Sequence, residues 1–334
     1  VGESLIRPVL AALGFTVWCF TLAAMFRAFA FALIMQIRHP FRPRRVFRPR
    51  AVAGHIRFGL RSAGSGLLYQ LYTNLDYTVV SYFFGATANG IYSMAYSIIL
   101  EPVRMITNVV SEVAFPTFAK LRHARDKLVD QYIRFTRLNL IAVLPFLLIL
   151  YLLAPEILRV FASGKWQEHE LAIAAEALRI LCLVGVLRPL GFLGPPLLDG
   201  MGHPGRTLRY MIACALIMPG IFAGAAWAFG DSHGLLSVAW AWSLGYPLPF
   251  VFLLFMIART INLPIARYAW ASMQIVLCAV AGYIAGALAL WAAGDLGGGA
   301  RIAIGASASL VAMFALLYGW QGVSIRSMRA SMKD

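Results

Sequence analysis

Two long apolar segments of the sequence each carry an acid and a base three residues apart. Glu101 and Arg104 stand in the first segment, and Glu176 and Arg179 repeat the spacing in the second. Side chains three residues apart are neighbours on a helix surface, so each couple is placed to form an ion pair or to bind a coupling ion. A charge inside a bilayer costs on the order of 2.5–3.5 kcal/mol, so each group needs a partner or a polar cavity.

Polar residues at alternating spacings of three and four mark one helical face of residues 58–84. This stripe consists of Ser62, Ser65, Tyr69, Tyr72 and Asp76, and it is widened by Gln70, Thr73 and Asn74. The next apolar segment carries a second stripe of Ser93, Ser97, Glu101, Arg104 and Asn108. Arg104 and, further along the chain, Arg188 fall close to mid-span, whereas the depth of Arg27 is ambiguous.

Two interpretations of these polar residues stay open. They either hold a helical bundle together through interhelical hydrogen bonds and ion pairs, or they line a polar, net cationic cavity between bundles. A cationic cavity inside a membrane suits an anionic ligand, for instance a phosphate-bearing head group.

The elements that position these residues are long apolar segments. Of the 334 residues, 60% are hydrophobic and 13% are charged, whereas a soluble protein carries about 25% charged residues. Segments of ~20 apolar residues cross a bilayer as helices, because a backbone in lipid must satisfy its own hydrogen bonds. The sequence therefore predicts an all-α fold, a polytopic transmembrane helical bundle of about nine spans. The spans are 9–36, 58–84, 89–118, 137–154, 174–199, 210–230, 234–258, 268–292 and 301–320. The fifth is predicted to break at Arg188-Pro189 and at Pro195-Pro196.

Basic residues predict the orientation of the chain. Alternating connections place nineteen Lys and Arg on one side and four on the other, so the N-terminus is expected outside and the C-terminus in the cytoplasm. Residues 38–57, which contain the most basic stretch 38–50, are predicted to be a cytoplasmic linker lying on anionic membrane lipids. Nucleic acid is disfavoured as a partner, because no stacking platform or fold motif accompanies the charge. Val1 at the start suggests that the chain begins inside something larger.

Catalytic and metal-binding patterns are missing from the sequence. There is no GxSxG, P-loop or HExxH motif, and the four cysteines lie singly in apolar segments. Weak acid–base candidates are Glu112, Asp199, Glu168, His169 and Glu170. We therefore expect no enzyme activity, no cofactor and no metal.

Several short strings occur in an order that resembles one family of membrane transporters. They are Phe58-Gly59-Leu60, Asn74-Leu75-Asp76-Tyr77, Phe84-Gly85-Ala86, Gly90-Ile91-Tyr92-Ser93-Met94-Ala95-Tyr96, Phe115-Pro116-Thr117-Phe118-Ala119-Lys120-Leu121, Leu153-Ala154-Pro155-Glu156, Gly164-Lys165-Trp166 and Pro195-Pro196-Leu197-Leu198-Asp199-Gly200-Met201-Gly202. Together these strings, within about 58–260, resemble the oligosaccharide flippases, the polysaccharide transporter branch of the multidrug/oligosaccharidyl-lipid/polysaccharide superfamily.

The resemblance implies a two-lobed fold of which this chain holds one part. Residues 1–37 would be the last helix of a truncated N-terminal lobe, followed by the linker 38–57. Residues 58–260 would form the six-helix C-terminal lobe, and 261–334 two accessory helices with a basic tail. The first five helices of the family pattern would then be absent.

The resemblance also implies a function, the transfer of undecaprenyl-diphosphate-linked oligosaccharide across the bacterial inner membrane by alternating access. Arg27, Arg104, Arg188, Asn74 and Asn108 are the head-group or cavity candidates. Asp76, Glu101, Glu176 and Arg179 are the candidates for coupling to H⁺ or Na⁺ or for ion pairing.

The resemblance also implies polysaccharide polymerase and export machinery as partners. Two alternatives stay open, a drug or small-molecule exporter of the same superfamily and an integral-membrane glycosyl- or acyltransferase.

Overall fold

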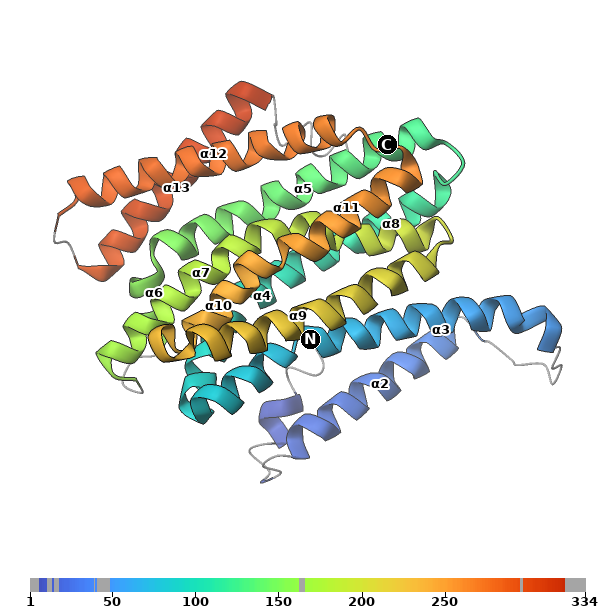
Figure 1. Cartoon of the computed structure of the whole chain (residues 1–334), viewed down its shortest axis with the longest axis horizontal. Coiled ribbons are helices and arrows are strands. Elements are labelled where there is room, and N and C mark those ends of the chain that lie inside the picture. Colours follow the sequence, from blue (N-terminus) through green and yellow to red (C-terminus); the bar gives the residue numbers. More distant parts are fainter. Residues whose placement is uncertain are drawn as a thin grey trace. The chain divides into compact units, whose positions relative to one another are not determined.

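The computed structural model describes residues 6–10, 14, 18–38, 40, 49–161, 166–294 and 297–321. The described elements are all helices (Figure 1). They are α2 Trp18–Arg38, α3 Pro49–Tyr72, α4 Leu75–Lys120, α5 Arg125–Leu152, α6 Ala154–Phe161, α7 Glu168–Phe192, α8 Gly194–Gly200, α9 Pro204–His233, α10 Leu236–Gly245, α11 Pro247–Ile261, α12 Ile265–Ala292 and α13 Gly298–Gln321. The all-α prediction is confirmed, and α6 is a short helix that the sequence did not predict.

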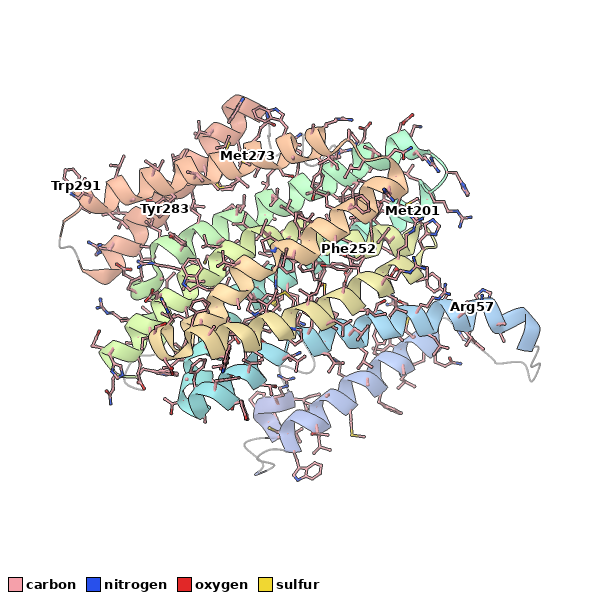
Figure 2. The ribbon with its side chains drawn as sticks, viewed as in Figure 1. Arg57, Met201, Phe252, Met273, Tyr283 and Trp291 are labelled. Atoms are coloured by element: carbon pink, nitrogen blue, oxygen red, sulfur yellow. The ribbon has the colours of Figure 1, made fainter. Side chains whose placement is uncertain are left out.

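The chain divides into two compact units, residues 1–54 and 55–334. The first contains α2, and most of the predicted basic linker, 39 and 41–48, lies outside the described residues. The second contains the remaining helices from α4 onward and most of α3. Within it α7 is central, packing against α4, α5 and α10, while α12 and α13 pack on each other and on α5 (Figure 2 shows the side chains).

Six helical segments of the described chain are long and apolar enough to cross a membrane. They are Thr21–Arg38, Arg125–Leu152, Pro204–His233, Leu236–Ile261, Ile265–Ala292 and Gly299–Trp320. The protein is therefore a multi-pass membrane protein, and the count of nine spans stays a prediction. The three further predicted spans, 58–84, 89–118 and 174–199, correspond to α3 with the start of α4, the rest of α4, and α7 with α8.

Local sequence explains where the predicted spans are interrupted. Span 58–84 divides after Tyr72, because Thr73 Oγ1 and Asn74 Nδ2 donate to the backbone carbonyls of Tyr69 and Gln70 at 2.7 and 2.6 Å. Within α4 the backbone turns at Gly85, whose φ of 84° and ψ of 177° suit glycine alone, and this matches the predicted connection 85–88.

The predicted break at Arg188-Pro189 is wrong. Helix α7 continues through Pro189 to Phe192, and the chain interrupts only at Leu193, before Pro195 and Pro196 open α8. A proline deprives a helix of one hydrogen bond, and here the packing of α7 between α4 and α5 outweighs that loss.

Helices α12 and α13 meet at small residues. A Cβ on Gly286 would collide with Ser309 Oγ, and one on Gly282 would lie 2.8 Å from the Ser309 carbonyl oxygen. The close approach gives van der Waals contact, which drives helix association in lipid in place of the hydrophobic effect.

Candidate functional site

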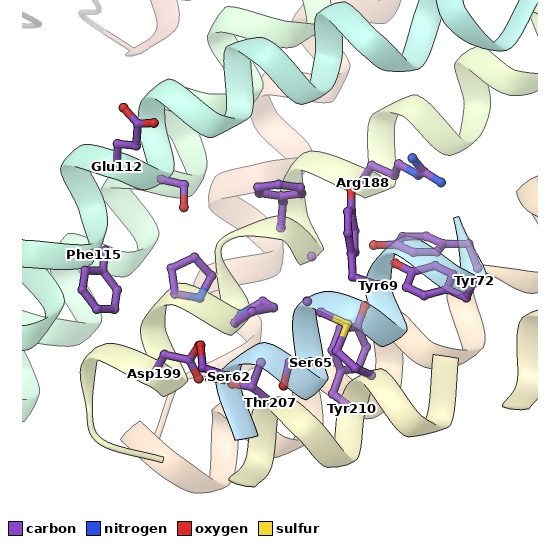
Figure 3. A pocket seen from close by; sticks show the side chains of 18 residues that line it. Ser62, Ser65, Tyr69, Tyr72, Glu112, Phe115, Arg188, Asp199, Thr207 and Tyr210 are labelled. Carbon is purple, nitrogen blue, oxygen red and sulfur yellow. Dashed lines mark hydrogen bonds between the residues drawn. The ribbon is translucent and has the colours of Figure 1, made fainter. Parts of the chain in front are cut away.

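A cavity of about 540 Å³ opens within the second unit (Figure 3). Helices α3, α4, α7, α8 and α9 line it, together with Tyr246 between α10 and α11. The stripe predicted on α3 contributes four polar residues to its lining, Ser62, Ser65, Tyr69 and Tyr72. The helices α3, α4 and α7, which are not among the six candidate spans, thus line this cavity together with the more apolar α9.

A second, smaller cavity of about 100 Å³ brings predicted site residues together. Asn74, Glu101, Arg104 and Arg188 all line it, on α4, α7 and the connection between α3 and α4. Arg188 and Tyr69 line both cavities, so these two side chains stand at the boundary between them.

Arg188 is held by aromatic rings. Its guanidinium carbon lies 4.3 Å from the ring centroid of Trp242 and 5.6 Å from that of Tyr96. Its Nη2 is buried and has no hydrogen-bond partner in the structure. A buried guanidinium N–H without an acceptor costs free energy unless a ligand accepts its hydrogen bond. Arg188 is therefore placed to bind an anionic or strongly accepting group.

Asp76 lies fully buried beside this arginine site. Its Oδ2 accepts from Trp242 Nε1 at 2.8 Å and Tyr92 Oη at 2.9 Å, and its Oδ1 accepts from the Tyr77 backbone N–H at 2.9 Å. Three donors stabilise a carboxylate where no bulk water reaches it. Trp242 therefore joins Asp76, through its N–H, to Arg188, through its ring face.

Glu101 and Arg104 form an ion pair of 2.6 Å on α4, as their spacing allows. Both side chains are partly exposed, and the carboxylate offsets the charge that Arg104 brings to the small cavity. That cavity has two arginines and one carboxylate among its lining residues, whereas the large cavity has Arg188 with Glu112 and Asp199. The predicted cationic character is thus restricted to the region of the small cavity.

The far end of the large cavity is acidic. Asp199 Oδ1 accepts from Thr207 Oγ1 at 2.6 Å, which ties α8 to α9. In Figure 3, Glu112, Phe115 and Asp199 lie at one end and Arg188 with Tyr72 at the other. Burial, and then the charge of Arg206, lower the pKa of His203 in the α8–α9 connection, so its ring is neutral near pH 7 and adds no positive charge there.

The other predicted site residues lie apart from both cavities. Asn108 is exposed on α4, and Glu176 and Arg179 are exposed on α7. Arg179 Nε donates to the Tyr151 carbonyl at 3.3 Å, so the acid–base spacing that pairs Glu101 with Arg104 gives no described ion pair here. Arg27 is exposed on α2, in the first unit.

The sequence did not predict three residues of the candidate site, Trp242, Glu112 and Asp199, as ligand-site residues. Trp242 lies in a strongly apolar segment. The one sequence signal that could have identified it as a site residue is its indole N–H, which needs a hydrogen-bond acceptor when it is buried. Glu112 and Asp199 were weighed only as weak catalytic groups. Within the described chain, no group of three or more His, Cys, Asp or Glu residues is arranged to hold a metal ion.

Comparisons with known proteins give a family and relatives in polysaccharide biosynthesis. A family model described as "Polysaccharide biosynthesis protein" matches residues 4–170. The teichuronic acid biosynthesis protein TuaB of Bacillus subtilis is 28% identical over 249 residues, 74% of this chain and 50% of its own length. The succinoglycan biosynthesis transport protein ExoT of Rhizobium meliloti is 28% identical over 251 residues, 72% of this chain and 48% of its own. The chain spans about half the length of these curated relatives.

Solved structures show the same fold. The lipid II flippase MurJ, in an inward closed conformation, superposes with a TM-score of 0.66 at 16% identity, over 95% of this chain and 66% of that one. An outward-facing multidrug resistance transporter of the MATE family superposes with a TM-score of 0.53 at 14% identity, over 80% of this chain and 64% of that one.

Proposed function

Because the chain belongs to the polysaccharide biosynthesis protein family, we propose that it acts in the flipping of undecaprenyl-diphosphate-linked oligosaccharide across the bacterial inner membrane. The observation that carries this proposal is Arg188, whose buried Nη2 lacks a partner at the boundary of two cavities. A diphosphate offers several charged acceptor oxygens to such a donor. Arg104 and Asn74, on the small cavity, complete the head-group site, and the predicted roles of Arg27 and Asn108 stay proposals.

The protein is a membrane protein, and we infer that it acts as a transporter and not as an enzyme, because ExoT is a transport protein and the fold is shared with transporters. The glycosyl- or acyltransferase alternative is thereby set aside. Alternating access is the proposed mechanism, with residues 58–260 as one lobe, 261–334 as the accessory pair, 38–57 as the linker and 1–37 as the end of another lobe. The similarity of fold to MurJ over most of the chain supports a transporter architecture.

Coupling to H⁺ or Na⁺ is proposed at Asp76, with Glu101 as the second candidate and Glu176 with Arg179 as further ones. Asp76 is supported by its burial and by its connection to Arg188 through Trp242. Neutralising it in Asp76→Asn should remove the dependence of transport on the ion gradient. The periplasmic N-terminus, the cytoplasmic C-terminus and the association with polymerase and export machinery also belong to this proposal.

Deleting the gene tests the function directly. We expect lipid-linked oligosaccharide to accumulate in the cytoplasmic leaflet, measured by its protection from a periplasmic glycosidase in intact spheroplasts. The wild-type gene should restore accessibility, Arg188→Lys should restore part of it, and Arg188→Ala should restore none. Normal leaflet distribution in the deletion strain would refute the proposal.

A drug exporter is the second candidate, and one observation favours it. The large cavity carries two acidic side chains against one basic one, which suits a cationic amphiphile. Increased sensitivity of the deletion strain to cationic drugs, with unchanged polysaccharide, would select this alternative.

A further inference from the structure

Resting on the proposed function, we propose that the large cavity holds the sugar residues next to the diphosphate, and that Glu112 and Asp199 make it select uncharged sugars over acidic ones. The diphosphate would lie at the other end, beside Arg188. The two parts of one substrate would thus be recognised by two regions of opposite charge.

The separation of charge along the cavity supports this division. Arg188 belongs to both cavities and Arg104 to the small one, whereas Glu112 and Asp199 line only the large one. Arg104 and Glu112 stand on the same helix, eight residues or about 12 Å apart along its axis. A ligand whose anionic group is at the arginines therefore extends its remaining part toward the carboxyl groups.

The lining of the large cavity suits a sugar. Aromatic rings offer apolar faces to the C–H groups of a pyranose, and hydroxyl groups exchange hydrogen bonds with its hydroxyls. The rings are those of Tyr69, Tyr72, Tyr210, Tyr246, Phe115 and Phe192. The hydroxyls of Ser62, Ser65, Ser111 and Thr207 lie among them. The volume of about 540 Å³ is within the usual ~300–1,000 Å³ of small-molecule sites.

The acidic end supplies the selectivity. A carboxylate accepts strong hydrogen bonds from sugar hydroxyls, and it repels the carboxylate of a uronic acid. The nearby basic residues Arg206 and Arg61 do not cancel this repulsion, because neither lines the cavity. Arg206 donates to Thr260 Oγ1 on α11, and Arg61 lies against Gly205. Glu112 is accessible to an incoming ligand, while Asp199 is half-buried and already bound by Thr207. Glu112 is therefore the residue to vary.

Binding to two matched lipids tests the proposal. The probes are undecaprenyl diphosphate carrying a glucosyl-glucose or a glucuronosyl-glucose disaccharide, added to the purified protein in lipid nanodiscs. Wild type should bind the uncharged probe about fivefold more tightly, a modest factor because exposed charges are screened. Glu112→Gln should bring the two affinities within about twofold, and Glu112→Lys should invert the preference. Asp231→Asn, which removes an exposed charge away from the cavities, should leave the preference unchanged.

The outcomes separate this inference from the proposed function. Binding of sugar-free undecaprenyl diphosphate to wild type, and its loss in Arg188→Ala, tests the head-group site alone. If wild type binds that lipid but does not distinguish the two disaccharides, or if Glu112→Lys leaves the preference as it was, the sugar selectivity is refuted and the flippase proposal stands. If wild type binds none of the lipids, both are refuted.

Discussion

The guanidinium of Arg188 lies over the ring of Trp242 at 4.3 Å, while the indole N–H of the same tryptophan donates to buried Asp76 at 2.8 Å. One aromatic side chain thus holds a cation by its face and an anion by its edge. Changes at Asp76, whether of charge or of hydrogen bonding, act on Trp242 and through it on the position of Arg188.

Trp242→Phe and Trp242→Leu should separate the two roles of this ring. Phenylalanine keeps an aromatic face for Arg188 but removes a donor from Asp76, which costs about 1–3 kcal/mol of stability. Leucine removes the donor and the face, so it should also weaken binding of undecaprenyl diphosphate. Thermal unfolding and lipid binding in nanodiscs measure the two effects. Equal lipid affinity of the two variants would show that the ring face does not position Arg188.

Glu101→Gln should leave stability nearly unchanged, because an exposed ion pair contributes about 0–1 kcal/mol. It should also strengthen binding of undecaprenyl diphosphate severalfold at low salt, since Arg104 then faces the ligand without its counter-charge. Arg104→Gln is the matched opposite and should weaken binding. If Glu101 couples an ion instead, the glutamine variant will bind lipid as wild type does and fail in transport.

Gly85→Ala should destabilise the protein by about 1–3 kcal/mol, because alanine does not adopt the positive φ and extended ψ of this turn. A Cβ added to Gly85 would meet no atom within 4 Å, so the cost is one of backbone conformation alone. Gly59→Ala, in regular helix α3 with equally open surroundings, should instead stabilise by up to ~1 kcal/mol. Thermal unfolding of the two variants against wild type measures the difference in sign.

Gly286→Val should separate α12 from α13, because the new side chain would collide with Ser309 and with Leu152 of α5. Gly319→Val adds the same side chain to α13 where nothing lies within 4 Å, and should have little effect. Disulfide trapping between cysteines placed on the two helices reports their separation. Unchanged trapping in Gly286→Val would show that this crossing does not depend on small residues.

Prediction from sequence succeeded where local rules decide the outcome. Apolar length predicted the helices, the stripe spacing predicted which face of α3 lines the large cavity, and the spacing of Glu101 and Arg104 predicted their ion pair. The same spacing at Glu176 and Arg179 gave no described pair, because spacing makes two side chains neighbours but does not fix their partners, and Arg179 donates to the Tyr151 carbonyl on α5 instead.

Contacts between distant parts of the chain were beyond such rules. Asp76 and Trp242 are 166 residues apart, and their hydrogen bond exists only because α4, α7 and α10 pack together. The acidic end of the large cavity likewise combines Glu112 on α4 with Asp199 on α8. Tertiary packing, which no periodicity encodes, assembled both.

The polarity of the cavity-lining helices constrains how the protein enters its membrane. Segments 58–84, 89–118 and 174–199 carry polar or charged side chains and are not among the six segments of the described chain that are long and apolar enough to cross a membrane. Polar side chains become tolerable in lipid only when other helices cover them. We therefore expect α3, α4 and α7 to be retained beside the translocon until more apolar neighbours such as α5 and α9 have been synthesised. These helices would then enter the bilayer as a group, and the cavity would form during biogenesis.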